Sequence, residues 1–332
     1  RRAFEHRRVL VAETHEEGAK MLEAGDHRRV FTHRGLGDAP DVVFMFPGGG
    51  AQYPNMARDL YETEPVFAEW MDRGLAALGE AEAETRALWL PAAGQEQAAT
   101  EALRQPSKQL PLILIVEVAL AKLWESWGIK PAMLIGHSMG ENAAACVAGV
   151  MTLEAAVGLV HLRGKLFDTI PAGGMLSVPL SEAALKPYLG DLDIASINAP
   201  ELTVVSGSDA GLKDLAARLK ADDIDTTRIA IDIAAHSKML EGILAAFRAH
   251  LAGMQLSSPQ IPIISNRSGQ VLTDAEATSP DYWVAHLRNT VRFADGMATL
   301  RQKPDRVYLE VGPGRAMASL AQANGAMGGQ PV

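Results

Sequence analysis

The chain has one cysteine, few positive charges for its size and no long apolar run. With Cys146 alone among 332 residues, no disulfide can form within the chain. The formal net charge is -9, which argues against nucleic acid as a partner, because binding there needs clustered Lys and Arg to neutralise phosphates. The two basic runs, Arg1–Arg8 and His27–Arg34, are short and are interpreted as surface or linker.

A membrane span and a signal peptide are also lacking. No stretch approaches the roughly 20 apolar residues that cross a bilayer. The longest candidate, Leu110–Leu120, is interrupted by Glu117 and fits a core helix. We therefore expect no membrane partner and a soluble, cytoplasmic protein. Because the chain begins with Arg1 and not with Met, we expect a piece of a longer protein.

Two strand–turn–helix units are predicted in the first half of the chain. The apolar content of the whole chain, 48%, is enough for a large core. Residues 41–46 form a short apolar run that stops at Pro47 and three glycines. Residues 132–135 form another, followed by a glycine-containing turn and an Ala-rich helical stretch. Helices are also expected over 54–75 and 111–127. Such units build an open, mainly parallel sheet, so the predicted fold class is α/β.

A smaller inserted subdomain is predicted from the shorter elements that follow Pro171. Their order is β-α-β-β-α-β, which is the ferredoxin-like pattern. Its strands are expected at 175–178, 192–197, 202–206 and 226–231, and its helices at 181–188 and 210–220. The predicted division is a large α/β-hydrolase-like subdomain at 41–171 and 235–322, a ferredoxin-like subdomain at 172–234, and a tail at 323–332.

The strongest chemical signal is Gly136-His137-Ser138-Met139-Gly140, which matches the G-x-S-x-G nucleophile elbow. A serine on a sharp strand-to-helix turn needs small neighbours, because larger side chains would collide with the adjoining strand and helix. The turn raises the hydroxyl above the sheet edge, at a helix N-terminus whose dipole favours developing negative charge. Ser138 is therefore the candidate nucleophile.

A serine hydroxyl needs a base, and one of the nine histidines stands out. His236 directly follows the last short strand, among small neighbours, where the insert rejoins the main sheet. His137 is next to the serine, but on the elbow its side chain should point away from Oγ. The others are interpreted as surface or core residues; they are His6, His15, His27, His33, His161, His250 and His286.

The ordered motifs resemble those of acyltransferase domains from modular type I polyketide synthases, and more distantly malonyl-CoA:acyl carrier protein transacylases. The resemblance covers residues 40 to 322. Its motifs are Phe46-Pro47-Gly48-Gly49-Gly50-Ala51-Gln52, Gly136–Glu141, Leu162-Arg163-Gly164-Lys165, Asn198-Ala199-Pro200, Val204-Val205-Ser206-Gly207, Ala235-His236-Ser237, Ser265-Asn266-Arg267 and Glu310-Val311-Gly312-Pro313-Gly314. The first 40 residues look like the end of a linker from a ketosynthase.

The resemblance implies a Ser138–His236 dyad in which a backbone carbonyl near Asn289–Arg292 orients the histidine. It implies an oxyanion hole made by the amides of Gly49 and Met139. Arg163 corresponds to the arginine that binds the free carboxylate of malonyl-type groups, which suits a bidentate guanidinium. Further substrate contacts are expected from Gln52, His137, Asn198 and Ala235.

The expected reaction is ping-pong transfer of a dicarboxylic acyl group from CoA, through Ser138, to the phosphopantetheine thiol of an acyl carrier protein. No metal and no permanently bound cofactor is expected. The partners are the carrier protein, the acyl-CoA and a ketosynthase in the same polypeptide.

Several alternatives remain open on the sequence. Met139 favours malonyl as the acyl group, whereas the small Ala235 leaves room for methylmalonyl or larger extenders. The family has Gln where this chain has Gly49 and often where it has Leu110, which would be compatible with an inactive docking domain. A serine hydrolase such as a thioesterase would need a carboxylate to orient His236 and would gain nothing from Arg163.

Overall fold

The computed structural model describes residues 4–25, 28–34 and 40–325, and the chain divides into two compact units, residues 1–40 and 41–332. In the first unit, strands β1 (His6–Leu10) and β2 (Val30–Arg34) pair antiparallel, with Leu10 opposite Val30. The helix α1 (His15–Ala24) lies between them in sequence, and the hydroxyl of Thr14 caps its N-terminus. This unit is therefore a two-stranded antiparallel sheet with one helix between its strands in sequence.

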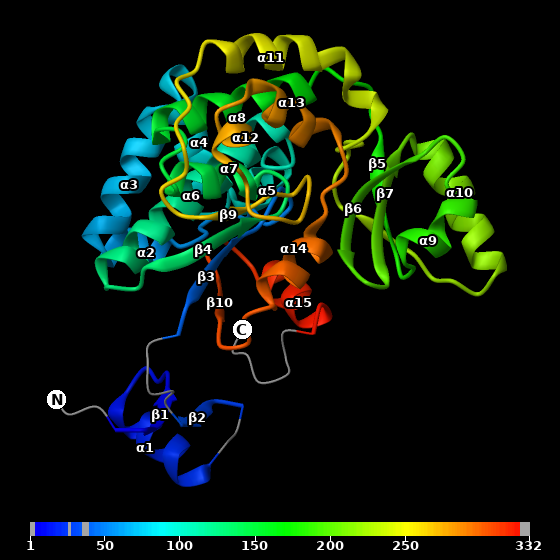
Figure 1. Ribbon diagram of the computed structural model, residues 1–332. Coiled ribbons are helices and arrows are strands. Elements are labelled where there is room, and N and C mark those ends of the chain that lie inside the picture. The colour runs from blue at the N-terminus through cyan, green and yellow to red at the C-terminus, as the bar shows by residue number, and fades with distance from the viewer. Residues whose placement is uncertain (1–3, 26–27, 35–39, 326–332) are drawn as a thin grey trace. The chain divides into compact units, whose positions relative to one another are not determined.

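The second unit is built on a parallel sheet, as predicted (Figure 1). Its strand order is β10-β3-β4-β9, and every neighbouring pair runs parallel. The strands are β3 (Val42–Phe46), β4 (Pro131–Gly136), β9 (Ile263–Ile264) and β10 (Val307–Glu310). In parallel strands the carboxyl ends meet at one edge, which is where ligands bind in open α/β sheets.

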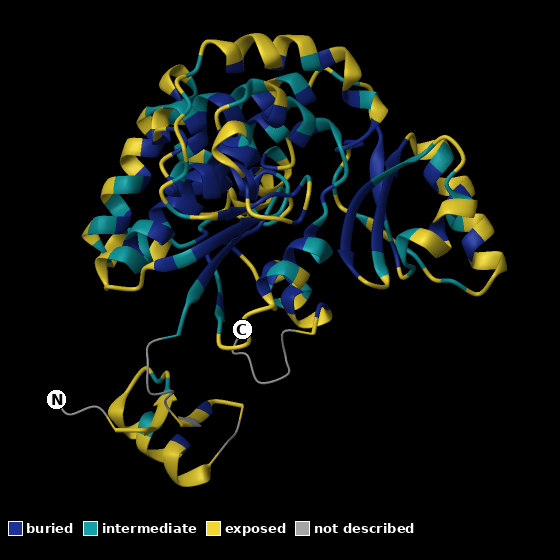
Figure 2. Cartoon of the chain, in the orientation of Figure 1, coloured by how far each residue is buried: buried dark blue, intermediate teal, exposed yellow. Residues whose placement is uncertain are grey.

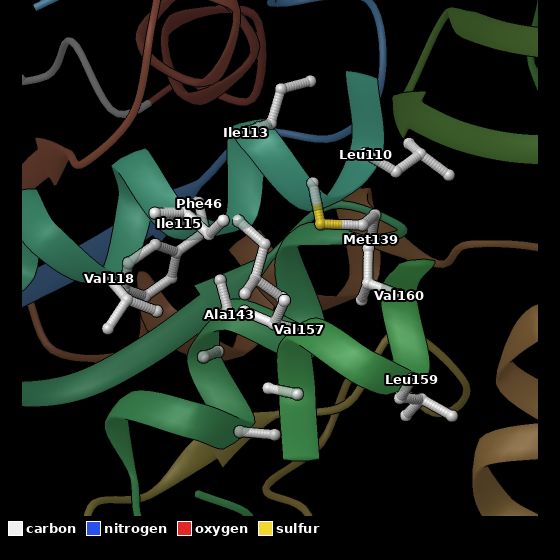
Figure 3. Packing of buried hydrophobic residues seen from close by; sticks show 14 of the residues in the cluster. Phe46, Leu110, Ile113, Ile115, Val118, Met139, Ala143, Val157, Leu159 and Val160 are labelled. Carbon is white, nitrogen blue, oxygen red and sulfur yellow. The ribbon is translucent and has the colours of Figure 1, made fainter. Parts of the chain in front are cut away.

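Side chains alternate between the two faces of this sheet, and both faces are buried (Figure 2). Phe44, Phe46 and Leu134 pack in the larger core with α6 (Pro106–Ser126) and α8 (Leu153–Phe167), part of which Figure 3 shows. Val43, Met45 and Ile135 pack in the smaller core with α14 (Phe293–Leu300) and α15 (Ala316–Ala323). Helices on both faces explain why the strands are almost wholly apolar.

No helix in the described part of the chain is long and apolar enough to cross a membrane. Most of the remaining helices of the large subdomain contribute residues to the larger core. Their bounds are α2 (Arg58–Thr63), α3 (Pro65–Ala76), η1 (Gly79–Ala81), α4 (Glu82–Trp89), α5 (Glu96–Ala102), α7 (Gly140–Val147), η3 (Lys238–Ile243), α11 (Leu244–Ala252), α12 (Asp274–Ala277) and α13 (Pro280–Arg288).

Two predicted helix boundaries were wrong, and proline explains both. The helix expected over 54–75 is broken at Glu64, which is extended (φ -115°, ψ 101°) because the following Pro65 disfavours a helical residue before it. The helix expected from residue 111 begins at Pro106 instead, with Pro111 inside it. Pro111 has no N–H for the Ser107 carbonyl, and His161 Nδ1 donates to that oxygen at 3.2 Å instead.

The inserted subdomain has the predicted ferredoxin-like order. It comprises β5 (Gly174–Val178), α9 (Glu182–Leu185), η2 (Lys186–Tyr188), β6 (Asp193–Ala199), β7 (Leu202–Gly207), α10 (Asp209–Ala221) and β8 (Thr227–Ile229). Its antiparallel sheet has the order β6-β7-β5-β8. One face packs on α9 and α10. The other face, with Met175 and Val204, forms one wall of the cavity described next.

Candidate active site

The elbow places Ser138 at the carboxyl end of β4 in a left-handed conformation, with φ of 53°. Its glycine neighbours are required by close backbone packing. A Cβ on Gly136 would lie 2.1 Å from the Glu141 amide nitrogen, and a Cβ on Gly140 would lie 2.1 Å from the Phe46 carbonyl oxygen. The steric reason given for the small residues around the serine is therefore confirmed.

His236 faces the serine, as predicted, with its Nε2 2.6 Å from Ser138 Oγ. Its Nδ1 lies 2.9 Å from the carbonyl oxygen of Asn289, within the predicted segment 289–292. A carbonyl can only accept, so Nδ1 carries the proton and Nε2 is free to accept the serine hydroxyl. Burial, and then the positive charge of Arg163, lowers the pKa of His236 to about 3. The ring is therefore a neutral base at physiological pH.

Arg163 extends from α8 into the same site and is 3% exposed. Its Nη2 donates to Ser138 Oγ at 3.0 Å and its Nη1 donates to Asn142 Oδ1 at 3.3 Å, while its Nε has no acceptor. Within the described ranges no carboxylate forms an ion pair with it, and burial lowers its pKa to about 10. A buried cation without a counter-ion is costly, which points to an anionic ligand.

The predicted oxyanion-hole amides belong to Gly49, after β3, and Met139, after Ser138. Both residues line the cavity, and in the part of the chain that the structure describes neither amide has a hydrogen-bond acceptor. The amide of Ser138 is different, because it donates to Asn266 Oδ1 at 2.8 Å. Two unoccupied backbone donors beside the nucleophile are what a developing oxyanion requires.

The cavity around these groups has a volume of about 490 Å³. Of its described lining residues, Arg163 alone carries a full charge at neutral pH, and most of the remaining wall is aliphatic. Ile231, Ile233 and Ala235 approach from the segment that rejoins the large subdomain. Among residues 4–25, 28–34 and 40–325, no group of three or more His, Cys, Asp or Glu side chains could hold a metal ion.

The other predicted substrate contacts are placed differently from one another. His137 and Asn198 line the cavity and are bonded to each other, with Nε2 and Oδ1 2.7 Å apart. Ala235 also lines it. Gln52 does not: its Oε1 accepts from the Gly50 amide at 3.0 Å and its Nε2 donates to a carbonyl on Leu103 at 3.2 Å. Gln52 therefore holds the loop of Gly48, Gly49 and Gly50 in place, and it does not lie where it would contact a ligand in the cavity.

Sequence reasoning missed three polar residues at the site. Gln109 lines the cavity beside Leu110, and its Oε1 accepts from the Gly50 amide at 3.2 Å. Asn266 and Glu141 form a buried network behind the elbow. Both belong to motifs of the sequence, Gly136–Glu141 and Ser265-Asn266-Arg267, but no sequence pattern predicts a bond between residues 125 positions apart.

Comparison with known proteins agrees with this geometry. The family model of the acyl transferase domain matches residues 43–326. The polyketide synthase GfsA of Streptomyces halstedii is 37% identical over an alignment of 328 residues that covers 94% of this chain and 4% of that protein. The mycoketide-CoA synthase of Mycobacterium tuberculosis is 36% identical over 97% of this chain and 8% of its own length. The chain thus spans a small part of the multidomain relatives that it matches.

Solved structures give the same assignment. The acyl transferase domain of ZmaA superposes with a TM-score of 0.90 at 37% identity, covering 98% of this chain and 76% of that one. The FabD protein of Acinetobacter baumannii superposes with a TM-score of 0.77 at 26% identity, covering 86% and 91%. The chain is therefore an acyltransferase that belongs to the acyl transferase domain family.

Proposed function

We propose that this domain loads a dicarboxylic extender unit, malonyl in the first place, from CoA onto Ser138 and passes it to the phosphopantetheine thiol of an acyl carrier protein. The observation that carries the proposal is the buried guanidinium of Arg163, which lies 3.0 Å from the nucleophilic oxygen and has no carboxylate partner within the described residues. The free carboxylate of a malonyl-type group would supply that partner in a bidentate pair.

The proposed chemistry has two symmetrical halves. His236 Nε2 takes the proton of Ser138, and Oγ attacks the thioester carbonyl while the amides of Gly49 and Met139 hold the oxyanion. The C–S bond breaks, and CoA leaves with the proton from His236. The carrier thiol then gives its proton to His236 and attacks the carbonyl of the acyl-serine. The C–O bond to Ser138 breaks, and His236 returns the proton to Oγ, which restores the hydroxyl.

The orientation of His236 favours a transferase over a serine hydrolase. Its Nδ1 bonds to the Asn289 carbonyl and not to a carboxylate. A hydrolase that accepts simple acyl groups would also leave Arg163 buried without a partner, which is costly. Intact oxyanion donors and an intact base argue in the same way against an inactive docking domain.

The aliphatic part of the cavity favours a second candidate substrate, a malonyl group with an α-substituent. Ile231, Ile233 and Ala235 leave a wide apolar region beside the site. The acyl transferase domain of SpnD, 33% identical with a TM-score of 0.88 and covering 100% of this chain and 78% of that one, was solved in complex with 2-(pent-4-yn-1-yl)malonyl. Methylmalonyl and larger extenders are therefore tested beside malonyl.

The partners follow from the same proposal. Acyl-CoA is a substrate here, and no permanently bound cofactor is required. The proposal includes a ketosynthase in the same polypeptide, with residues 1–40 as the end of the linker between the two; the polyketide synthases that this chain matches are much longer than the chain.

The test is a single-turnover assay with malonyl-CoA and a phosphopantetheinylated carrier protein. The proposal expects malonyl-carrier to form faster than free malonate. Free malonate at the rate of CoA release, with or without the carrier, would mean that the protein is a hydrolase.

A further inference from the structure

Asn266 follows β9 at the carboxyl edge of the sheet and is 1% exposed. Its side chain and its backbone amide form hydrogen bonds with residues of the elbow. Its Oδ1 accepts from the Ser138 amide at 2.8 Å, and its Nδ2 donates to the Gly136 carbonyl at 2.8 Å. Its own amide donates to Glu141 Oε2 at 2.6 Å. Its carbonyl accepts from the Arg292 amide at 2.7 Å.

The two side-chain bonds bracket the nucleophile. One holds the amide of Ser138, and the other holds the carbonyl two residues before it. Ser138 is left-handed, a conformation that side-chain-bearing residues adopt only where the surroundings hold them in it. The carboxamide of Asn266 supplies one acceptor and one donor at the spacing that this turn presents.

The backbone carbonyl of Asn266 reaches the support of the base. Arg292, which donates to it, lies three residues after Asn289, whose carbonyl orients His236. Between them, Val291 is held from the other side by β6: its amide donates to Ala195 at 2.9 Å and its carbonyl accepts from Ile197 at 2.9 Å. One residue therefore contacts the nucleophile's turn and the segment that orients the base.

A buried set of groups fixes Asn266 in turn. Glu141 is fully buried, and its second oxygen accepts from the Tyr282 hydroxyl. That hydroxyl lies 2.7 Å from Ser265 Oγ, on the residue before Asn266. The backbone amide of Asn266 is thus held by the carboxyl group of Glu141, which is itself anchored, so the carboxamide has little freedom to turn away from the elbow.

We propose that Asn266 is a positioning residue for the reaction: its side chain holds Ser138 in the attacking conformation, and its main chain steadies the carbonyl that orients His236. The role rests on the proposed function of Ser138 as nucleophile. It also restricts the oxyanion hole, because the Ser138 amide is occupied and only the amides of Gly49 and Met139 remain for the substrate oxygen.

The test compares Asn266→Ala with Asn266→Asp. Alanine removes both side-chain bonds. A protonated aspartic acid reproduces them, with one oxygen accepting from Ser138 and the O–H donating to Gly136, whereas an ionised aspartate can only accept. The readouts are the rate constants of Ser138 phosphonylation by a fluorophosphonate, which needs no acyl substrate, and of acylation by malonyl-CoA. Both are taken per reactive site from the time course, between pH 5.5 and 9.

We expect Asn266→Ala to lower both rate constants about 100-fold, as a displacement of about 1 Å does, with little change in the KM for malonyl-CoA. Asn266→Asp should approach wild-type rates at pH 5.5 and decline relative to wild type as the pH rises. The ratio to wild type is taken at each pH, because burial raises the pKa of Glu141, which accepts from the Asn266 amide, to about 7. Thr203→Val, which removes a fully buried hydroxyl bonded to the Leu180 carbonyl at 2.7 Å, is the control and should stay within threefold of wild type.

Rate constants within threefold of wild type in Asn266→Ala would overturn the proposal. So would a smaller reactive fraction with an unchanged rate constant, which is the result of a purely structural role. If Asn266→Ala does not fold, a pH-independent rate in Asn266→Asp overturns it instead. If wild type is phosphonylated but not acylated, the proposed function fails while the role of Asn266 is still decided by the fluorophosphonate.

Discussion

His236 Nε2 lies 2.6 Å from Ser138 Oγ, and both residues have positive φ, 57° and 53°. In the described part of the chain only three other non-glycine residues share this backbone conformation: Asn55, Ala57 and Asp223. Such strain costs on the order of 1–3 kcal/mol per residue and persists where packing and hydrogen bonds impose it. The nucleophile and the base are thus held on strained backbone, which explains the density of buried polar contacts around them.

The acylation rate should not depend on the ordinary titration of histidine. Burial lowers the pKa of His236 to about 3, so the base stays neutral in the free enzyme well below pH 6.5. Because kcat/KM reports the free enzyme, its profile for malonyl-CoA should be flat from pH 8 to pH 5. Stopped-flow acylation with pH-jump controls for stability measures this. An inflection of kcat/KM near pH 6.5, at a pH where the folded fraction does not change, would contradict the prediction.

Folding stability should depend on pH through the same group. In the folded state His236 remains neutral, whereas the unfolded chain takes up a proton below pH 6.5. The contribution of His236 to the free energy of unfolding is therefore complete above pH 6.5. It is lost as the pH falls toward 3, by about 1.4 kcal/mol per pH unit. Urea unfolding of wild type and His236→Gln measures this. Between pH 8 and pH 5 the free energy of unfolding should fall less in the variant than in wild type. Parallel curves would contradict the assignment.

Arg163→Met should separate substrate choice from stability. Loss of a bidentate pair costs about 3 kcal/mol or more, so acylation by malonyl-CoA should fall about 100-fold relative to acetyl-CoA. The melting temperature should not fall, because removing a buried unpaired charge relieves a desolvation cost. Mass-spectrometric competition between the two thioesters measures the ratio. An unchanged preference for malonyl-CoA would exclude Arg163 as the carboxylate partner.

Gly140→Ala should destabilise the protein, while Gly158→Ala should not. The new Cβ at residue 140 would meet the carbonyl oxygens of Phe46 and Pro47 at 2.1 and 2.4 Å, which forces backbone to shift and costs about 1–3 kcal/mol or more. Gly158 lies inside α8 with nothing within 4 Å, so alanine there should gain about 0.5–1 kcal/mol. Denaturant midpoints for the two variants test the pair; equal effects would contradict the packing argument.

Ala235→Phe should narrow the substrate range. Ala235 lines the cavity next to His236, and a phenyl ring there would fill space that an α-substituent would use. We expect acylation by ethylmalonyl-CoA to fall at least tenfold relative to acylation by malonyl-CoA. One methylene in an apolar pocket changes discrimination between substrates by about 1–3 kcal/mol, which corresponds to about 10–200-fold. An unchanged ratio would place the substituent elsewhere in the cavity.

The local part of this site could be predicted from the sequence. The strand, turn and helix around Ser138 are contiguous, and the small residues follow from sterics that a pentapeptide already shows. The ferredoxin-like insert was predictable because its elements alternate in a known order. Helix boundaries near Pro65 and Pro106 were misjudged, since proline can begin a helix as well as end one.

The long-range part was not predictable from one sequence. The carbonyl that orients His236 lies 53 residues away, and the resemblance gave only a range for it. The bond between Asn266 and Glu141 spans 125 positions, and it depends on how β9 packs beside β4. Gln109 was missed because its side chain reaches the glycine loop only once α6 is placed against the sheet.

The most direct test of the account is the intact mass of the protein after incubation with an equimolar mixture of acetyl-, malonyl-, methylmalonyl- and ethylmalonyl-CoA. The proposed mechanism predicts an adduct of a carboxylated acyl group that is absent in Ser138→Ala, a variant that should remain folded. A malonyl adduct supports the favoured substrate, and a branched adduct moves the choice to the α-substituted candidate. An acetyl adduct alone, or a carboxylated adduct that persists in Ser138→Ala, would contradict the account.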